Sequence, residues 1–452
     1  RSLCDWSSDV CSSDLARDPI CACATPWGTG AIAVVRVSGP DLAPLIRRVC
    51  GPLPGARRVR LARLRDDAGV FDEGLVTWMP GPASYTGEDV AEISCHGNPL
   101  LVERLLAALV TAGARPAHPG EFTRRAFLNG RMDLTRAEAV LQAITATSDR
   151  GLAVARAGLE GRLAAEADAL RDVLVDVAAE LEAVLDYPEE DLVLGGDDGR
   201  VSRLQETAGR ARTLASGYRA GRIAVEGARV ALVGPVNAGK SSLFNRLLGR
   251  DRALVSPTPG TTRDVVEAVV QTPSARLVLM DTAGEREDPE AIEAEGLALA
   301  ARLVEPADLR LVVLPGDRPL DADGARVLAR TRTPRLVVAT HADRPIALDL
   351  PVDHRVSSVT GDGIAALLAA LPSAIAGDEA AADTIVADQR QYDALLRLAV
   401  AAEAAATALP FAGPAVAVEE VYAALAALDG LVGRDTREDV LDRLFTRFCI
   451  GK

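Results

Sequence analysis

The residues with the clearest chemical purpose form the pattern Gly234-x4-Gly239-Lys240-Ser241, which lies between the apolar run 228–233 and a helical segment. Glycines at these positions let the backbone curl so that its N–H groups and the N-terminus of the following helix face phosphate oxygens. Lys240 then places a point charge on the β- and γ-phosphates, and the Ser241 hydroxyl reaches Mg²⁺. The pattern predicts a nucleoside triphosphate site whose contacts here are Asn237, Ala238, Gly239, Lys240, Ser241 and Ser242.

Two later segments carry, in order, the magnesium and γ-phosphate motifs of a GTPase. In "PGTTRD", residues 259–264, Thr262 is expected to complete the magnesium shell and close over the γ-phosphate. The apolar run 276–281 ends at Asp281, which would steady Mg²⁺ through a bound water, and the backbone N–H of Gly284 would meet the γ-phosphate. The predicted nucleotide contacts in this region are Ser256, Thr258, Pro259, Gly260, Thr261, Thr262, Asp281, Thr282, Ala283 and Gly284.

The segment that reads the base departs from the usual Asn-Lys-x-Asp and instead reads "THAD", residues 340–343. The carboxylate of Asp343 would accept hydrogen bonds from the N1–H and amino groups of guanine. Thr340 would donate a hydrogen bond through its hydroxyl. The His341 side chain would lie across the guanine ring, where the usual motif places the stem of its lysine. Ser357 and Ser358 open the last base-side loop, "SSVTGDG". We expect guanine preference with weakened affinity; the alternative is an ordinary strand end in an ATPase.

Hydrolysis requires an oriented water, and Glu285 occupies the position at which Ras-like enzymes carry a glutamine. Its charge beside a γ-phosphate is unfavourable unless a cation intervenes. Glu290 and Glu293 follow closely. For each of these acids, the alternative role is a solvated helix start, where acidic residues favour the positive end of the helix dipole.

The elements that must position these residues follow from apolar patterns. Buried runs at 228–233, 276–281, 309–314 and 335–340, which alternate with helical segments, predict a doubly wound parallel sheet with its ligand at the carboxyl ends of the strands. Residues 134–187 contain a seven-residue apolar repeat, which predicts a packed helical seam that ends before Pro188. The members of the repeat are Leu163, Ala167, Leu170, Leu174, Val177, Leu181 and Val184.

The chain ends in "FCIGK", residues 448–452, and an amphipathic stripe precedes this tail. Thr436 with Asp439 resembles a capping box that would start the helix. The apolar residues of the stripe are Val440, Leu441, Leu444, Phe445 and Phe448. Such a helix would anchor the tail, in which Cys449 is either a small buried hydrophobe or a reactive thiol.

Composition limits the function classes. Sixty-four acidic residues against 50 basic ones give a net charge of −14, which argues against indiscriminate nucleic-acid binding. Any RNA contact would use local arginine patches, such as 56–65 or the run from Arg115 to Arg131, although a solvated arginine face is the alternative for each. The only lysines are Lys240 and Lys452, which singles both out for a function that arginine cannot perform.

No membrane span or hydrophobic signal segment is evident, which indicates a cytoplasmic protein without membrane contact. The opening residues 1–15 read as a non-native segment derived from a sequencing adaptor. The remaining cysteines show no paired metal-binding spacing, so neither structural zinc nor a disulfide framework is expected.

Four signatures in order make the chain resemble the MnmE (TrmE) tRNA-modification GTPases: "ATPWGTGAIAVVRVSG", "PGPASYTGEDVAEISCHGNP", "HPGEFTRRAFLNGRMDLTRAEA" and the terminal "FCIGK". The resemblance covers nearly everything after Ala16. It implies an N-terminal α/β folate-binding-like and dimerisation domain (16–133) and a helical domain (134–225 and 376–452). A Ras-like GTPase domain (226–375) interrupts that helical domain.

The resemblance also implies roles for single residues. Arg36, Glu92, Arg131 and Lys452 look like contacts to 5-formyltetrahydrofolate or a related reduced folate, although surface arginines and a half-buried strand acid remain the alternative. Asn237, Ser256, Thr258 and Thr261 look like ligands of K⁺, and Glu293 resembles the family's water-orienting glutamate, which makes it preferable to Glu285. The expected catalytic set is Glu293, Lys240, Thr262 and Gly284, with Mg²⁺ on Ser241 and Thr262.

The expected function is potassium-stimulated GTP hydrolysis by a homodimer that assembles with an MnmG-like flavoprotein as a heterotetramer. Together they would convert the wobble uridine of certain tRNAs to a 5-carboxymethylaminomethyl or 5-aminomethyl derivative. The chain has no dinucleotide-binding glycine fingerprint, so FAD and NADH are expected on the partner. One alternative is a regulatory GTPase that acts in ribosome or RNA assembly, and another is an N-terminal domain that serves only as a dimer scaffold.

Overall fold

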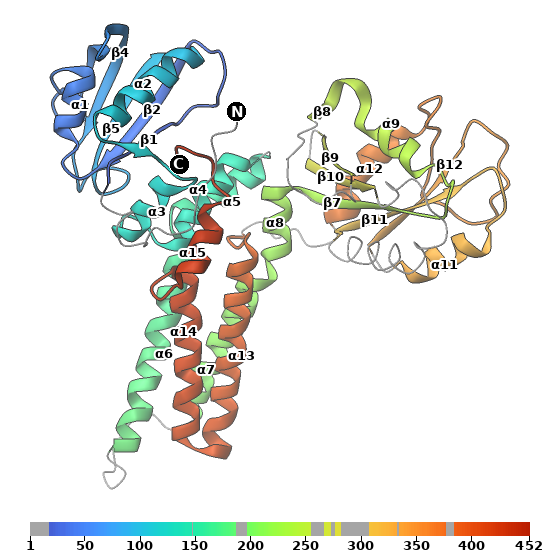
Figure 1. Cartoon of the computed structure of the whole chain (residues 1–452). Coiled ribbons are helices and arrows are strands. Elements are labelled where there is room, and N and C mark those ends of the chain that lie inside the picture. The colour runs from blue at the N-terminus through green and yellow to red at the C-terminus, as the bar shows by residue number, and fades with distance from the viewer. Residues whose placement is uncertain are drawn as a thin grey trace, which may run out of the picture. The chain divides into compact units, whose positions relative to one another are not determined.

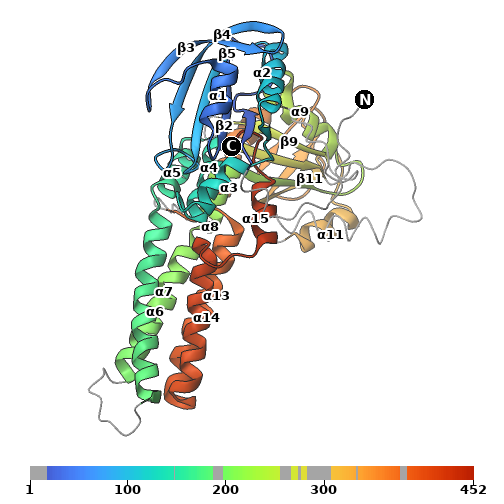
Figure 2. The same ribbon diagram turned by 60° about the vertical axis from the view of Figure 1, so that its left-hand side comes forward.

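The computed structural model describes residues 18–146, 148–186, 197–254, 266–272, 276–281, 307–331, 334–376 and 384–452. Figures 1 and 2 show the chain in two views. It forms two compact units: one contains the chain up to Leu141 with Ala164–Val175 and Leu425–Lys452, and the other contains Gln142–Leu163 and Asp176–Ala424. The segment 1–15 lies outside the described residues, as do the predicted site residues Ser256, Thr258, Pro259, Gly260, Thr261, Thr262, Thr282, Ala283, Gly284, Glu285, Glu290 and Glu293.

A six-stranded sheet in the order β3-β4-β5-β2-β1-β6 forms the N-terminal part of the first unit. Its core lies where α1 and α2 cover one face, with Val35, Ile93 and Leu105 fully buried. The neighbouring strands are antiparallel, except that β1 pairs in parallel with β6. The elements are β1 (Ile20–Cys23), β2 (Ile32–Gly39), α1 (Ala43–Cys50), β3 (Val59–Asp66), β4 (Gly69–Met79), β5 (Asp89–His96), α2 (Pro99–Thr111) and β6 (Arg115–Pro116).

A second core in this unit joins α3 (Glu121–Leu128), α4 (Leu134–Thr145) and α15 (Glu438–Phe445) to the C-terminal tail. Leu134 packs with Leu441, Phe445 and Phe448, so the predicted amphipathic stripe is confirmed. The predicted capping box is wrong, because the residue that caps α15 is Arg437, and the helix start has no side-chain cap. Packing of the apolar face, rather than a capping hydrogen bond, fixes where this helix lies.

Long helices make up much of the rest: α5 (Asp149–Leu159), α6 (Arg162–Asp186), α7 (Asp197–Ser216), α8 (Tyr218–Glu226), α13 (Gln389–Ala412) and α14 (Pro414–Val432). The apolar repeat of α6 is buried from Leu163 to Leu181, and only Val184 is half-buried, which confirms the predicted helical face. Among the described residues, α13 alone is long and apolar enough to cross a membrane. It packs along α7, as the core helix of a bundle does.

A seven-stranded sheet in the order β13-β12-β11-β7-β10-β9-β8 forms the nucleotide-binding-like part of the second unit. Strands β10, β7, β11, β12 and β13 pair in parallel, whereas β9 pairs antiparallel with β10 and β8. Apolar side chains of α9 and α12 pack against the sheet, which confirms the predicted α/β class. The elements are β7 (Ala228–Val233), α9 (Lys240–Arg252), β8 (Ala253–Leu254), β9 (Val266–Gln271), β10 (Arg276–Asp281), β11 (Leu309–Pro315), α11 (Ala322–Arg330), β12 (Arg335–Thr340), β13 (His354–Arg355) and α12 (Ile364–Ala376).

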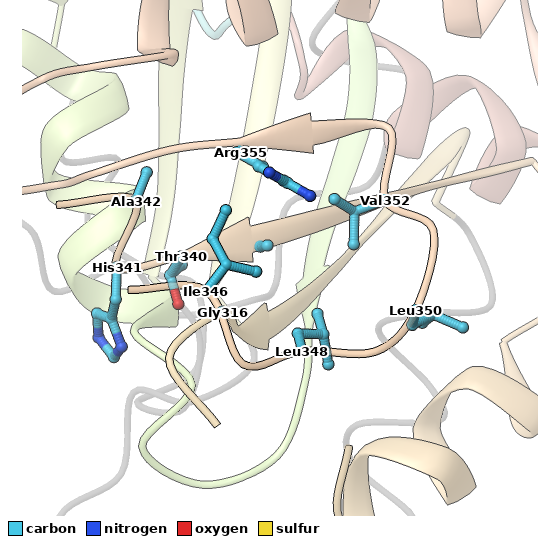
Figure 3. A pocket seen from close by; sticks show the side chains of 10 residues that line it. Gly316, Thr340, His341, Ala342, Ile346, Leu348, Leu350, Val352 and Arg355 are labelled. Carbon is cyan, nitrogen blue, oxygen red and sulfur yellow. The ribbon is translucent and has the colours of Figure 1, made fainter. Parts of the chain in front are cut away.

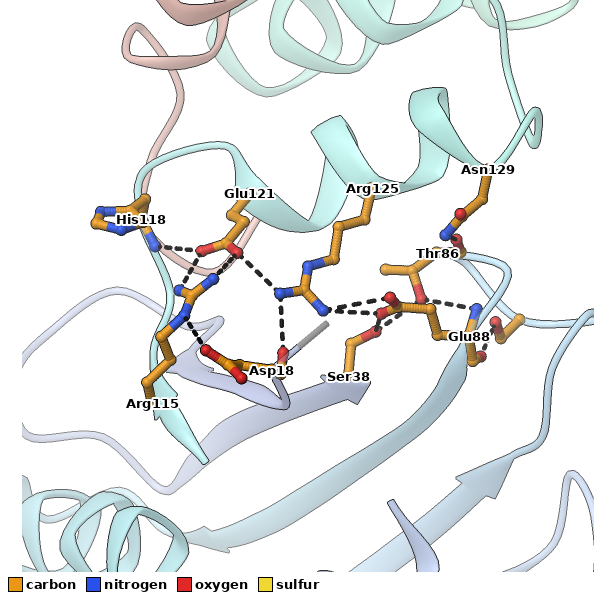
Figure 4. Close-up of polar contacts among 10 residues, drawn as sticks. Asp18, Ser38, Thr86, Glu88, Arg115, His118, Glu121, Arg125 and Asn129 are labelled. Carbon is orange, nitrogen blue, oxygen red and sulfur yellow. Dashed lines mark hydrogen bonds and ion pairs between the residues drawn. The ribbon is translucent and has the colours of Figure 1, made fainter. Parts of the chain in front are cut away.

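Buried ion pairs hold α3 against the N-terminal sheet (Figure 4). The Arg125 guanidinium donates to Glu88 at 3.1 Å and to Glu121 at 3.0 Å, and Arg115 donates to Glu121 at 2.6 Å. The backbone N–H of His118 donates to the same Glu121 carboxylate at 2.9 Å. Burial raises the pKa of Glu121, but these hydrogen bonds and charges outweigh it and leave the pKa below its ordinary value.

A lowered pKa in the folded state means that the Glu121 carboxylate stabilises this unit above the pKa of the unfolded chain, about 4.3. That stabilisation is lost as the pH falls through the lower, folded value. We expect Glu121→Gln to reduce the unfolding free energy by about 3 kcal/mol at pH 7 and to flatten its decline in acid. Urea unfolding followed by tryptophan fluorescence between pH 3 and 7 measures both effects.

The exposed pair Arg63–Glu73 provides the control, because Glu73→Gln should cost about 0.5 kcal/mol or less. Equal losses for the two substitutions would contradict the role assigned to the buried network.

Candidate nucleotide site and tail cluster

The phosphate loop between β7 and α9 adopts the conformation that its sequence predicts. Gly239 has φ +86°, and Asn237, at φ +59°, uses the left-handed region that asparagine tolerates. A Cβ on Gly234 would lie 2.2 Å from the Val313 carbonyl oxygen on β11, so only glycine fits there. The loop therefore packs closely against the end of the sheet, and the N-terminus of α9 faces the space in which a phosphate would bind.

Lys240 lies at the centre of this loop. Its ammonium donates to the carbonyl oxygens of Gly234 and Pro235, each at 2.9 Å, which holds the charge inside the curl. Burial lowers the pKa of Lys240, and the negative charge of Asp281 opposes that shift. Asp281 itself is only 4% exposed and ends β10, beside the strand that leads into the loop.

Oxygen groups suited to Mg²⁺ lie at the same edge of the sheet. Ser241 and Ser242 are exposed in the first turn of α9, and Asp281 supplies a carboxylate. Hydroxyl and carboxylate oxygens are the ligands that Mg²⁺ prefers, so these residues fit a magnesium ion. Asn237, the predicted ligand of a monovalent cation, is exposed in the loop.

The base-reading segment is tied to the phosphate loop by Thr340, which is 2% exposed. Its hydroxyl donates to the Ala238 carbonyl at 2.8 Å, with the Leu314 carbonyl also within 3.2 Å. Asp343 accepts a hydrogen bond of 2.6 Å from Ser357, whose oxygen in turn accepts from the backbone N–H of Thr360 at 3.1 Å. The Ser357 bond lowers the pKa of Asp343, which keeps this exposed carboxylate ionised.

Sequence reasoning missed Asp317, whose carboxylate holds His341 and Arg344 of the same segment in place. The Nδ1 atom of His341 lies 3.0 Å from Asp317, and Arg344 donates to the same carboxylate at 2.7 Å. These two hydrogen bonds lower the pKa of Asp317 to about 2. Asp317 lies two residues after the end of β11, and the parallel pairing of β11 with β12, in which Pro315 lies opposite Thr340, brings it beside His341. That pairing is a feature of the tertiary structure.

A mostly apolar pocket lies beside this segment (Figure 3). Ile346, Leu348, Leu350 and Val352 line it together with Thr340 and His341. Among the described residues, neither Asp343 and Ser357 nor residues 234–241 of the phosphate loop belong to its lining. It therefore lacks the groups that a guanine base requires, and we place the nucleotide at the loop instead.

In the other unit, three of the four predicted folate contacts come together. Arg36 on β2 donates to Glu92 on β5 at 3.0 and 2.8 Å, both bonds reaching Oε1, and to the Gly451 carbonyl at 3.3 Å. Burial and the Arg36 charge lower the pKa of Lys452, against the effect of Glu92. Two cations beside one carboxylate fit an anionic ligand. The fourth residue, Arg131, is exposed and packs its stem near Gly87.

The tail is fixed by backbone contacts that allow little variation. Gly451 has φ +99°, and a Cβ there would lie 2.5 Å from the Cys23 carbonyl oxygen. The Phe122 N–H donates to the Lys452 carbonyl at 3.2 Å. Phe448 is 4% exposed, whereas the Cys449 thiol is free and exposed, which removes the buried-hydrophobe alternative for it.

The prediction that this cluster holds a reduced folate can be tested with Gly451→Ala, which should displace Lys452 and lower affinity for the folate about 10-fold, because a charge-assisted contact to the ligand would be lost. Calorimetric titration with 5-formyltetrahydrofolate measures this. Gly413→Ala is the matched control, since Gly413 has φ +88° but no heavy atom near its built Cβ. The assignment fails if both variants bind like the wild type.

Comparison with known proteins gives two family matches. Residues 19–131 match the model of the GTP-binding protein TrmE N-terminus, and residues 134–449 match the MnmE helical domain. Among curated proteins, the tRNA modification GTPase MnmE of Akkermansia muciniphila is 42% identical over 446 residues, which cover 96% of this chain and 98% of that protein. The protein of the same name from Thermus thermophilus is 42% identical over 96% of this chain and 99% of its own length.

Solved structures with similarity include the G domain of the Thermotoga maritima FeoB iron transporter. That domain is 23% identical, with 32% of this chain and 98% of that one covered, at a TM-score of 0.24. An Aquifex aeolicus Era structure is 23% identical over 40% of this chain and 66% of its own, at a TM-score of 0.27.

The two family models together span almost the whole described chain, and the curated relatives match it nearly end to end. The protein is a GTPase that belongs to the MnmE family of tRNA modification GTPases.

Proposed function

We propose that this chain is a potassium-stimulated GTP hydrolase that acts with an MnmG-like flavoprotein to modify the wobble uridine of certain tRNAs in the cytoplasm. The observation that carries the proposal is the coexistence of a formed phosphate loop and an anchored cationic tail cluster in one chain. GTP hydrolysis is the first activity, and presentation of a one-carbon donor is the second.

The GTP half of the proposal is supported by the geometry around Lys240. The N-terminus of α9 is the kind of helix start whose backbone N–H groups bind phosphate oxygens, and Lys240 is its first residue. Mg²⁺ would be held by Ser241 and Thr262 and would neutralise charge on the transferred phosphoryl group. Glu293 would orient the attacking water.

Potassium dependence is proposed for Asn237 together with Ser256, Thr258 and Thr261. In support, Asn237 is an exposed residue of the loop. A potassium ion there would supply the positive charge that an arginine finger provides in other GTPases.

The folate half is supported by the charge balance of the tail cluster. Arg36 and Lys452 suit the carboxylates of a glutamate tail, and Glu92 suits the guanidine-like edge of a pterin, since its Oε2 accepts no hydrogen bond from described residues. A reduced folate bound there would supply a one-carbon unit. The dimeric state, the heterotetramer and the Arg131 contact belong to the same proposal.

Mass spectrometry of tRNA nucleosides from a strain that lacks this protein tests the whole proposal. We expect loss of the aminomethyl-type wobble uridine, restored by the wild type and not by a variant without GTP hydrolysis. GTP hydrolysis should fall when Na⁺ replaces K⁺, and Asn237→Ala should abolish that difference. Intact wobble modification together with cofractionation on ribosomal subunits would favour the assembly-factor alternative and contradict the proposal.

A further inference from the structure

One segment beside and within the N-terminal sheet is positively charged, whereas the whole molecule is negatively charged. Between positions 47 and 65 the chain carries Arg47, Arg48, Arg57, Arg58, Arg60, Arg63 and Arg65, and it has no acidic residue there, although the net charge of the protein is −14. The segment includes the end of α1, the following loop and the edge strand β3. We call it the α1–β3 arginine segment.

Guanidinium groups of this segment converge at the C-terminus of α1. The Nη2 atom of Arg60 donates to the Cys50 carbonyl at 2.7 Å. A Cβ on Gly51 would lie 3.7 Å from this atom and 3.4 Å from the Nη2 atom of Arg65. One cation suffices to cap the carbonyl end of a helix, so Arg60 has a structural role while Arg65 adds positive charge beyond it.

Few of these charges are neutralised. Within the described part of the chain, Arg47, Arg58 and Arg65 take part in no ion pair, and all three are exposed. Arg48 pairs with the highly exposed Asp67 at 3.5 Å, and Arg63 pairs with Glu73 at 3.2 Å on the surface. The nearby Asp66 is already bound by Arg104 at 2.6 Å. The segment therefore keeps a net positive charge.

The second arginine run of the sequence behaves differently. Arg115 and Arg125 are bound to Glu121 and Glu88 inside the buried network, and Arg124 pairs with Glu438 and Asp442 at 3.3 Å. Those charges hold α3 and α15 in place and are largely neutralised. Arg131, at the end of this run, is exposed but is a single charge that the proposed folate contact already uses. Of the two arginine patches, the α1–β3 segment therefore offers the larger group of exposed arginines without an ion pair among the described residues.

We propose that the α1–β3 arginine segment binds the phosphate backbone of tRNA. This inference rests on the proposed function, because it takes tRNA as the substrate. An acidic chain would repel a polyanion unless it concentrated positive charge locally. Arginine is suited to this purpose, because its planar guanidinium stays charged and donates to phosphate oxygens in pairs.

The test compares tRNA binding by the full-length Arg58→Gln/Arg65→Gln variant with that of the wild type, using fluorescence anisotropy with an unmodified tRNA transcript from 50 to 200 mM salt. We expect about 30-fold weaker binding near 100 mM and a salt slope smaller by about 1.5, because two phosphate contacts are lost. The control Arg212→Gln/Arg326→Gln removes the same charge from exposed arginines that are already paired with Glu403 and Asp323, and it should bind within about twofold of the wild type.

Unchanged affinity and slope in the first variant, or equal losses in both, would overturn the inference. Weakened binding to the flavoprotein with unchanged tRNA affinity would assign the surface to an acidic protein instead, which also overturns it. A wild type that hydrolyses GTP but holds no tRNA in this assay would reject the tRNA surface alone. Failure of the proposed function is distinct, since it appears as intact wobble uridine modification in the deletion strain.

Discussion

Lys240→Ala should lower kcat/KM for GTP hydrolysis by about 10³-fold, which is the loss typical of removing one preorganised charge from a developing phosphoryl transition state. The Lys240 ammonium is held by two carbonyl oxygens within the loop, so it is in position before the substrate arrives. Because its charge interacts most strongly in the transition state, kcat should fall more than KM rises.

Steady-state phosphate release and nucleotide titration separate these two effects. Lys452→Ala is the matched control, since it removes the only other lysine and leaves the phosphate loop intact. Hydrolysis by Lys452→Ala should stay within about twofold of the wild type, because Lys452 lies in the other compact unit. A loss of less than about tenfold in Lys240→Ala would mean that the loop does not carry the chemistry.

Asp343→Asn should weaken GTP binding by about 100-fold, because the side chain would then present a donor to the N1–H and amino group of guanine. The Ser357 hydrogen bond and the lowered pKa keep Asp343 an ionised acceptor. Xanthosine triphosphate, which has a carbonyl where guanine has the amino group, should lose much less affinity or gain some.

Competition titrations with both nucleotides check this expectation. Asp362→Asn serves as the control in the same region, because the exposed Asp362 carboxylate accepts from the Thr360 hydroxyl at 2.8 Å, whereas Ser357 bonds to the Asp362 backbone carbonyl, which the substitution leaves in place. If Asp343→Asn lowered affinity for both nucleotides equally, the carboxylate would be structural, and the identification of "THAD" as the guanine-reading segment would fail.

The phosphate loop and its sheet could be predicted from sequence because they depend on neighbouring residues. The glycine spacing, Lys240 and the apolar run before them lie within about a dozen positions, and the backbone geometry that binds phosphate is set by those residues alone. The apolar repeat of α6 and its end before Pro188 are likewise local, and burial of that face agrees with it. The capping box at Thr436 failed because packing of α15 against α4 outweighed a single local hydrogen bond.

What the sequence by itself determined is thus the P-loop GTPase class, the helical seam and an anchored tail, each fixed by short-range spacing. Only the tertiary structure decided how distant residues pair. It brought Arg36 to Gly451 across 415 positions, joined Asp317 to His341, and showed that one arginine run is neutralised by carboxylates while the other is not. The physical reason is that ion pairs and hydrogen bonds between elements depend on how the folded chain places distant residues next to one another. The spacing of residues in the sequence does not specify that placement.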